Sequence, residues 1–406
     1  MAEPRTAIVI GGSLGGLTAA NVLQRAGWNV QVHERVAEEL EGRGAGIVTH
    51  PELLQALAQA GVTVDASLGV RVAERVVLAR DGSVQARHAL PQMLTAWARL
   101  YQVLRQALPA GHYHNGRQLV GVAQDAGGVT ARFADGSTAR ADLLVAADGI
   151  RSTVRQALLP EVRPAYAGYL AWRGLVEESA LSARTREELL PYFAFGLPPH
   201  EQMVAYPVAG RDQSVAPGRR RFNFVWYRPA AEHGLLRELL TDAQGKHWPD
   251  GIPPPLIREQ VLADARRAAH EVLAPQFAEV VEKTQGLFFQ PIFDLESPQL
   301  AFGRIALLGD AAFVARPHCG MGVAKAAGDA LELVAALQRH TEVAAGLQDY
   351  ARSRQPYGAA IVGHARALGR YMQSQLRNDE ERAMAERYRS PEAIMRETAV
   401  PPRVAA

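Results

Sequence analysis

The sequence predicts a mixed α/β protein with an inserted, mostly antiparallel β-sheet and a helical C-terminal segment. The chain opens with a strand–turn–helix–strand unit of about thirty residues. Apolar and aromatic runs separated by turns fill residues 166–227, and residues 349–388 are rich in Ala, Arg, Glu and Gln. The opening unit is the βαβ arrangement of a Rossmann-like dinucleotide-binding domain.

The opening unit consists of two short strands around one helix. Residues 6–10 (TAIVI) form a continuous apolar run, residues 17–26 have a helical pattern, and residues 29–33 (NVQVH) alternate as a strand does. Two later apolar runs, residues 142–147 (DLLVAA) and 304–308 (RIALL), resemble the first strand in composition. We therefore expect these strands in one sheet, although they are far apart in the chain.

The inserted sheet is predicted from four runs, YLAWRGLV, YFAFGL, MVAYPV and RFNFVWY, which turn-rich pieces separate. After Ala324 the pattern becomes helical, because Leu331, Val334 and Leu337 can share one face. The expected division is a nucleotide-binding domain in three parts, 1–75, 96–160 and 283–345, a substrate-binding sheet domain from 76–95 and 161–282, and C-terminal helices with a tail, 346–406.

The composition excludes several classes of protein. The 406 residues include 44 Lys or Arg and 42 Asp or Glu, and the net charge of +2 provides no strong field for nucleic acid or an anionic membrane. No run approaches the roughly 18 apolar residues of a membrane span, and the single cysteine, Cys319, excludes an intrachain disulfide. We therefore expect a cytoplasmic protein without nucleic-acid or membrane partners. The oligomeric state is not readable from the sequence, and a homodimer is left open.

A glycine-rich turn, Gly11-Gly12-Ser13-Leu14-Gly15-Gly16, joins the first strand to the first helix. Gly11 can make the tight turn, Gly16 lets the helix approach the strand, and free N–H groups at the helix start can bind a pyrophosphate. Glu34 ends the second strand 23 residues after Gly11, where a carboxylate can accept from both hydroxyls of an adenosine ribose. The turn predicts a dinucleotide without a 2′-phosphate, and it leaves NAD and FAD as alternatives.

Two later segments decide between these cofactors. Residues 143–155 read LLVAADGIRSTVR, and residues 304–330 read RIALLGDAAFVARPHCGMGVAKAAGDA. With the glycine-rich turn and the Glu34-Arg35 pair, they resemble the three fingerprints of the single-component flavoprotein aromatic hydroxylases, the family of para-hydroxybenzoate hydroxylase. The resemblance implies an FAD-binding domain and NAD(P)H as a transient cosubstrate. In that family O₂ forms a C4a-hydroperoxyflavin, whose distal oxygen is transferred to an electron-rich ring.

The resemblance also implies which residues bind FAD. The glycine-rich turn matches positions at the pyrophosphate, Glu34 and Arg35 match the adenosine end, Asp310 matches the ribityl region, and residues 317–323 match the loop beside the isoalloxazine ring. The implied FAD-binding residues are Gly11, Ser13, Leu14, Gly16, Glu34, Arg35, Leu119, Asp148, Asp310, Pro317, Gly320, Gly322 and Val323. The positions that depart from the family pattern are Trp97, Phe313 and Ala324.

A narrower resemblance covers most of the chain. GAGIVTHPEL (44–53), YAGYLAWRGLV (166–176), VAYPVAGR (204–211) and ARPHCGMGVAKA (315–326) are similar to the dihydroxypyridine hydroxylase branch, which hydroxylates hydroxylated N-heteroaromatic rings. The implied function is monooxygenation of a small aromatic substrate, a (di)hydroxypyridine-type ring, with O₂ and NADH or NADPH. The alternative is an epoxidase, Baeyer–Villiger enzyme or reductase of the same fold, acting on another aromatic or a polyketide-like substrate.

Three residues are the catalytic candidates. The ring must become phenolate-like, so we expect a hydrogen-bond acceptor or base near its hydroxyl. His50 follows the GAGI segment and can face the flavin and substrate, with a structural histidine as the alternative. Tyr206 resembles a family position that contacts substrate, with core packing as the alternative. Gln202 stands where related pyridine hydroxylases often carry histidine, and it can orient a ring nitrogen but cannot act as a base at neutral pH. No metal is expected.

Other conspicuous residues are expected to be structural. Tyr169, Trp172 and Arg173 form a stripe that is more typical of a core than of a substrate site. The run Arg219-Arg220-Arg221 is expected at a solvated hairpin tip, and attraction of the NAD(P)H phosphates is the alternative. No second strand-linked G-x-G-x-x-G pattern occurs in the sequence, so the nicotinamide cofactor is expected to bind transiently at the surface.

Overall fold

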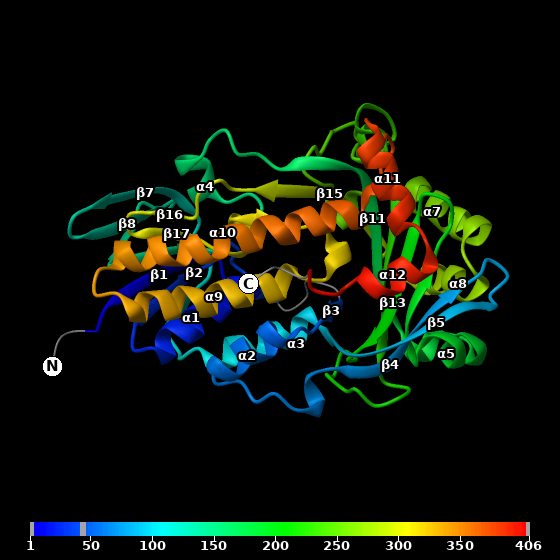
Figure 1. Cartoon of the computed structure of the whole chain (residues 1–406), viewed down its shortest axis with the longest axis horizontal. Coiled ribbons are helices and arrows are strands. Elements are labelled where there is room, and N and C mark those ends of the chain that lie inside the picture. Colours follow the sequence, from blue (N-terminus) through cyan, green and yellow to red (C-terminus); the bar gives the residue numbers. More distant parts are fainter. Residues whose placement is uncertain (1–3, 41–45, 403–406) are drawn as a thin grey trace.

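The computed structural model describes residues 4–40 and 46–402, which form two large sheets with helices on their faces (Figure 1). Residues 41–45 lie outside the described residues, and with them the first two residues of the GAGIVTHPEL segment.

The first sheet contains the strands that the opening βαβ unit predicts. In spatial order its strands are β16 (Ala301–Phe302), β17 (Ile305–Leu307), β10 (Leu143–Ala146), β1 (Thr6–Ile10), β2 (Asn29–His33) and β6 (Tyr113–His114). β1 pairs in parallel with β2 and β10, and β10 pairs in parallel with β17. Every side chain of β10 is fully buried, as expected for a central parallel strand. The predicted union of these distant segments in one sheet is confirmed.

The second sheet has nine strands. In spatial order they are β18 (Phe313–Val314), β15 (Phe288–Glu296), β11 (Ala165–Glu177), β14 (Arg221–Pro229), β13 (Gln202–Val208), β12 (Tyr192–Gly196), β4 (Val70–Leu78), β5 (Val84–Ala96) and β3 (Gly46–Val48). Its pairings are antiparallel except that of β12 with β4, which confirms the mostly antiparallel prediction. The sheet begins before the expected boundary at residue 76, because β3 and the first half of β4 already belong to it.

The two faces of the nine-stranded sheet have different neighbours. Side chains that point to one face, such as Phe224 and Trp226 of β14, share a core with Phe277. Side chains on the opposite face, such as Tyr169 of β11 and Tyr227 of β14, belong to the core of the nucleotide-binding domain. This alternation follows from the two-residue period of a strand. Polar side chains on the second face therefore point towards the nucleotide-binding domain, which contains the glycine-rich turn.

Helices cover both units. They are α1 (Leu14–Arg25), α2 (Pro51–Gln59), α3 (Trp97–Ala107), α4 (Thr153–Leu158), α5 (Ala183–Leu189), α6 (Arg237–Leu239), α7 (Glu259–Val272), α8 (Pro275–Lys283), α9 (Gly322–Arg339), α10 (Val343–Leu368), α11 (Asp379–Tyr388) and α12 (Pro391–Glu397). α9 packs between α1 and α10, and the long α10 runs along the molecule towards the nine-stranded sheet (Figure 1).

Two local expectations were wrong, and one small sheet was not predicted. α1 begins at Leu14 and not at residue 17, because the second half of the glycine-rich turn is already helical. The helical region 349–388 is interrupted after Leu368, where Gly369 ends α10. Residues 119–141 add a small antiparallel sheet that the sequence analysis did not separate. Its strands are β7 (Leu119–Asp125), β8 (Gly128–Phe133) and β9 (Thr138–Ala141).

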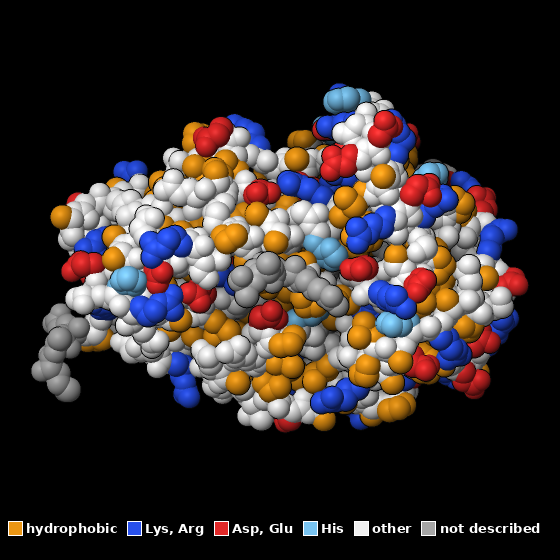
Figure 2. All heavy atoms as spheres, in the orientation of Figure 1, with side chains coloured by type: hydrophobic (Ala, Val, Ile, Leu, Met, Phe, Trp, Pro, Cys, Tyr) orange, Lys and Arg blue, Asp and Glu red, His pale blue; other side chains and the backbone are white. Residues whose placement is uncertain are grey.

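Acidic and basic side chains are interspersed over the molecular face in Figure 2, in keeping with the small net charge. Within residues 4–40 and 46–402, none of the helices combines the length and apolar composition that a membrane crossing requires.

Candidate active site

The glycine-rich turn leaves no room for side chains at Gly11 and Gly16. Gly11 has φ +100°, and a Cβ atom there would lie 2.4 Å from the Ala147 carbonyl oxygen. A Cβ on Gly16 would lie 1.8 Å from the Gly11 carbonyl oxygen. Ser13 is the N-cap of α1, but its side chain makes no capping hydrogen bond. The turn therefore keeps the N–H groups of the first helical turn available to an anion.

Glu34 holds the turn from the end of β2. Its side chain is 6% exposed, and its two carboxylate oxygens accept from the backbone N–H groups of Gly12 (2.8 Å) and Val36 (2.9 Å). Each oxygen keeps a further lone pair for a ligand hydroxyl. A cavity of about 190 Å³ lies beside this carboxylate. Six predicted cofactor residues line it, namely Gly11, Ser13, Glu34, Arg35, Leu119 and Asp148.

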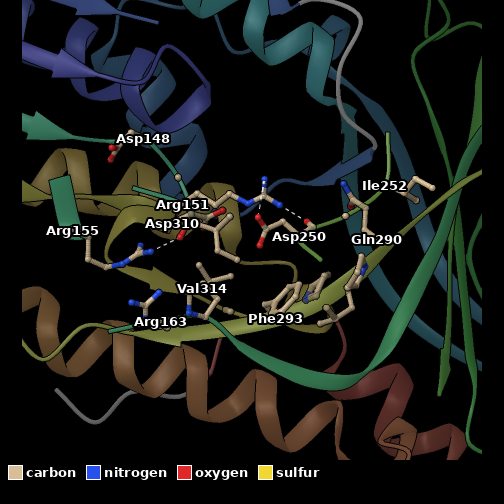
Figure 3. A pocket seen from close by; sticks show the side chains of 18 of the residues that line it. Asp148, Arg151, Arg155, Arg163, Asp250, Ile252, Gln290, Phe293, Asp310 and Val314 are labelled. Carbon is tan, nitrogen blue, oxygen red and sulfur yellow. Dashed lines mark hydrogen bonds and ion pairs between the residues drawn. The ribbon is translucent and has the colours of Figure 1, made fainter. Parts of the chain in front are cut away.

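A larger cavity of about 1170 Å³ continues from the first, and Arg35, Asp148, Asp310 and Pro317 line it. Figure 3 shows the side chain of Asp310 at the centre of this cavity and Arg151 reaching across to Asp250. Arg151 donates to the Asp250 backbone oxygen and lies 3.9 Å from the Asp250 carboxylate. The cavity exceeds the roughly 300–1,000 Å³ of ordinary ligand pockets, and it has room for more than one ligand.

Two carboxylates in these cavities have oxygen atoms without hydrogen-bond partners among the described residues. Asp148 Oδ2 accepts from the Thr153 N–H (2.7 Å), but its Oδ1 is buried without a hydrogen bond. Asp310 is exposed to the cavity, although protein surrounds it on its other sides, and this burial raises its pKa. Unpartnered acceptors of this kind fit a ligand that presents hydroxyl donors. The cradle at Gly11 and Gly16 fits a pyrophosphate, so the residues fit FAD.

The remaining predicted cofactor residues lie around these cavities without lining them. Leu14 and Gly16 belong to α1, and Gly322 and Val323 open α9. Gly320 ends the short 3₁₀ turn Pro317–Cys319 with φ +64°, and a Cβ there would lie 2.9 Å from Ala399 Cβ. The loop from Pro317 to Met321, hereafter the 317–321 loop, joins the large cavity at Pro317 to the N-terminus of α9.

Two of the catalytic candidates, His50 and Gln202, contact this loop, and all three are deeply buried. His50 Nε2 lies 3.2 Å from the Gly320 carbonyl oxygen, and Gln202 Oε1 lies 3.2 Å from His318 Nδ1. Tyr206 stacks on Phe193 with ring centroids 4.9 Å apart. None of the three candidates lines either of the two cavities described above.

Sequence reasoning missed His318 as part of this group. Its Nε2 lies 2.8 Å from the Tyr169 hydroxyl, and its ring centroid lies 4.2 Å from that of Tyr227. Burial, with the nearby Arg316 and Arg173 charges, lowers the pKa of His318 well below its usual value, so the imidazole is neutral. Because Gln202 Oε1 accepts from Nδ1–H, the free Nε2 accepts from Tyr169. The alternating pattern of β11, β13 and β14 was the signal for this, since it places Tyr169 and Gln202 on one face.

A second missed residue, Arg75, ties the C-terminal segment to the same loop. Arg75 is fully buried, and it donates to the carbonyl oxygens of Met395 (2.7 Å) and Thr398 (2.6 Å) at the end of α12. Beyond α12, the Ala399 N–H donates to the His318 carbonyl oxygen at 2.7 Å. Among the described residues Arg75 has no carboxylate partner, and burial lowers its pKa to about 9. No local sequence signal links residues that are more than 300 positions apart.

One other expectation is corrected here. Arg220 is not at a solvated tip, because its buried guanidinium pairs with Glu178 at 2.9 Å, whereas Arg219 is exposed beside Asp212. Phe313, one of the positions that depart from the family pattern, packs against Gly358 of α10, where a Cβ would lie 2.3 Å from the ring. Within the described part of the chain no group of three His, Cys, Asp or Glu side chains could hold a metal ion.

Comparisons with known proteins agree with this arrangement. Models of an FAD binding domain-like family and an FAD binding domain family match residues 166–294 and 258–365. The chain is 32% identical to 2,6-dihydroxypyridine 3-monooxygenase of Paenarthrobacter nicotinovorans, over 90% of this chain and 91% of that protein. It is 30% identical to an FAD-dependent urate hydroxylase of Klebsiella pneumoniae, over 86% and 85% of the two chains.

A solved structure gives the same result. The structure of 2,6-dihydroxypyridine-3-hydroxylase from Arthrobacter nicotinovorans superposes with a TM-score of 0.85 at 30% identity, covering 94% of this chain and 96% of the other. The fold, the cavities at the glycine-rich turn and these relatives agree, and the chain belongs to the FAD-dependent aromatic monooxygenases.

Proposed function

We propose that this monooxygenase hydroxylates a (di)hydroxypyridine-type N-heteroaromatic ring, with O₂ and a reduced nicotinamide as cosubstrates. The observation that carries the proposal is the buried chain Gln202–His318–Tyr169, whose members are all neutral hydrogen-bonding groups. Neutral donors and acceptors suit a ring that presents a nitrogen and hydroxyl groups. The similarity to 2,6-dihydroxypyridine 3-monooxygenase supports the same substrate class.

The proposed FAD site follows the two cavities. The glycine-rich turn (Gly11, Ser13, Leu14 and Gly16) would hold the pyrophosphate, and Glu34, Arg35 and Leu119 the adenosine end. Asp148 and Asp310 would accept from hydroxyl groups in the middle of the cofactor. The loop residues Pro317, Gly320, Gly322 and Val323 would lie beside the flavin ring, where N–H groups at the start of α9 favour negative charge. When bound, reduced FAD would activate O₂, from which one oxygen atom would enter the substrate ring.

The protein's own proposed contribution is to shape and orient the site around the ring. Gln202 keeps the proton of His318 on Nδ1, so Nε2 stays an acceptor that holds the Tyr169 hydroxyl. Tyr169 is completely buried, and burial raises its pKa, so it serves as a hydrogen-bond donor and not as a base. His50 and the Ala399 N–H hold the carbonyl oxygens of Gly320 and His318, and these contacts define the shape of the 317–321 loop. Tyr206 would extend the aromatic packing on this face of the sheet through its stack with Phe193.

The experiment is a substrate panel on FAD-loaded protein. NADH and NADPH oxidation and O₂ uptake are measured with 2,6-dihydroxypyridine, 6-hydroxynicotinate, para-hydroxybenzoate and urate. The proposal expects a hydroxypyridine to stimulate both signals most strongly, with a product that has gained one oxygen. Stimulation by para-hydroxybenzoate alone would rule out the substrate class.

A matched pair of variants tests the role of the chain. Tyr169→Phe removes the hydroxyl that donates to His318, whereas Tyr166→Phe removes a hydroxyl on the same strand that donates to the Ala230 carbonyl oxygen. We expect Tyr169→Phe to retain FAD but to form less product per NAD(P)H oxidised, with Tyr166→Phe unchanged. If both variants form the same amount of product per NAD(P)H oxidised, Tyr169 has a packing role only.

The alternative chemistries of this fold have distinct products. A reductase consumes NAD(P)H without O₂ uptake, and a Baeyer–Villiger enzyme inserts oxygen into a ring carbon–carbon bond. Mass and NMR spectra of the product separate both from ring hydroxylation.

A further inference from the structure

A third cavity, of about 350 Å³, lies at the end of the nine-stranded sheet and is lined by an excess of positive charge. Arg173, Arg211, Arg221 and Lys283 line this cavity, and Glu177 is the only acidic residue of the described chain that does so. It shares Arg173 and Phe288 with the large cavity, so the two are neighbours. We call it the basic cleft.

The charges of the basic cleft are largely uncompensated. Glu177 is engaged by Arg211, with 2.7 Å between Nε and Oε1. Within the described residues, Arg173, Arg221 and Lys283 form no ion pair, and Arg173 Nε is buried without any hydrogen bond. Arg221 uses only its Nε, which donates to the Ala209 carbonyl oxygen at 3.2 Å. Partly buried cations without counter-charges favour an anionic ligand.

The alternation of side chains along the strands places the basic cleft beside the large cavity. Arg173 and Glu177 of β11 alternate to the same face as Tyr169, and Arg221 of β14 lies directly opposite Glu177 in the register. This face belongs to the core of the nucleotide-binding domain. A ligand anchored in the basic cleft can therefore extend past Arg173 into the large cavity.

We propose that the basic cleft binds the phosphate groups of the reduced nicotinamide cosubstrate. A dinucleotide carries two charges on its pyrophosphate, and the three cations without ion pairs in the described residues, Arg173, Arg221 and Lys283, match that multiple charge better than they match a singly charged ring. The chain has a single glycine-rich strand–helix turn, which the proposed FAD site uses, so the second dinucleotide needs another phosphate site. The inference rests on the family's use of a reduced nicotinamide and on the FAD site proposed above, but not on the identity of the aromatic substrate.

Two arginines of one hairpin provide the test. Arg221→Gln removes a cation of the cleft, and Arg219→Gln removes an exposed arginine that pairs with Asp212 outside the cleft. FAD-loaded protein is mixed with NADH or NADPH in the absence of oxygen and of aromatic substrate, and flavin reduction is followed against cosubstrate concentration. We expect the apparent dissociation constant to rise about tenfold or more in Arg221→Gln, as for one charge-assisted hydrogen bond, and to stay at the wild-type value in Arg219→Gln.

Inorganic pyrophosphate is the second probe. It should compete with the cosubstrate in the wild-type protein and lose its effect in Arg221→Gln. Lys283→Gln changes an exposed residue of the basic cleft and should weaken cosubstrate binding without affecting folding. It therefore tests the proposal even if Arg221→Gln does not fold. Equal dissociation constants in Arg221→Gln and Arg219→Gln would overturn the proposal. So would an unchanged cosubstrate constant in this assay if a separate turnover assay of Arg221→Gln showed a raised KM for the aromatic substrate. Because the assay omits that substrate, its outcome is independent of the hydroxypyridine assignment.

Discussion

Replacing Asp310 with alanine should weaken FAD binding without weakening the fold. The Asp310 carboxylate makes no hydrogen bond to the described residues and is exposed to the 1170 Å³ cavity, so its removal breaks no protein contact. Burial and the nearby Asp329 raise its pKa, while Lys325 opposes this shift. The apoprotein therefore gains nothing from this charge, and a ligand donor is its natural partner.

The magnitude follows from the one interaction that Asp310 would make. A charge-assisted hydrogen bond is worth about 1.5–3 kcal/mol, which corresponds to a roughly 10- to 150-fold rise in the Kd for FAD. Asp310→Asn retains an acceptor oxygen without the charge and should show a smaller loss.

The assay is a titration of apoprotein with FAD, followed by flavin fluorescence, together with thermal unfolding of each apoprotein. Asp264→Ala, at an exposed position of α7 that pairs with Arg267, is the control for removing an aspartate elsewhere. If Asp310→Ala is folded and binds FAD within twofold of wild type, the assigned role of Asp310 is wrong.

Three further predictions concern stability. Gly16→Ala should destabilise the protein by about 3 kcal/mol, because its Cβ would lie 1.8 Å from the Gly11 carbonyl oxygen. Gly363→Ala, which has open space around it, should leave the stability unchanged. Equal urea midpoints for the two variants would contradict this prediction. Burial lowers the pKa of His33 to about 4. The neutral His33 therefore contributes about 3 kcal/mol to the free energy of unfolding above pH 6.5, and this contribution is lost as the pH falls towards 4. His33→Phe should flatten that pH dependence in apoprotein denaturation, and parallel curves would refute it. Arg75→Met should lower the free energy of unfolding by about 1–3 kcal/mol, because the carbonyl oxygens at the end of α12 lose their hydrogen-bond donor. An unchanged free energy of unfolding would show that α12 does not depend on Arg75.

Local signals in the sequence predicted the parts of the fold that depend on short-range chemistry. The bounds of β1 and β2 match the prediction, because an apolar run ends at Gly11 in one case and an alternating run ends at Glu34 in the other. The antiparallel sheet followed from aromatic and β-branched runs separated by turns. The break at Gly369 was missed because residues 370–388 remain rich in Arg, Glu and Gln, a composition typical of helices, and no proline marks the end of the helix.

The cofactor cavities were more predictable than the catalytic group. Gly11 and Glu34 belong to one local motif, so their proximity follows from the βαβ unit. By contrast, Gln202 meets His318 across more than 100 residues, and Arg75 meets Thr398 across more than 300. Such contacts depend on how the sheet, the 317–321 loop and the C-terminal segment pack together, which no spacing in the sequence encodes.

The most direct test of the proposed reaction is to supply ¹⁸O₂ to FAD-loaded protein with a reduced nicotinamide and 2,6-dihydroxypyridine, and to determine the mass of the product. The account predicts a ring-hydroxylated product that carries one ¹⁸O atom. An unlabelled product, or NAD(P)H oxidation that yields only hydrogen peroxide with every hydroxypyridine offered, would contradict it.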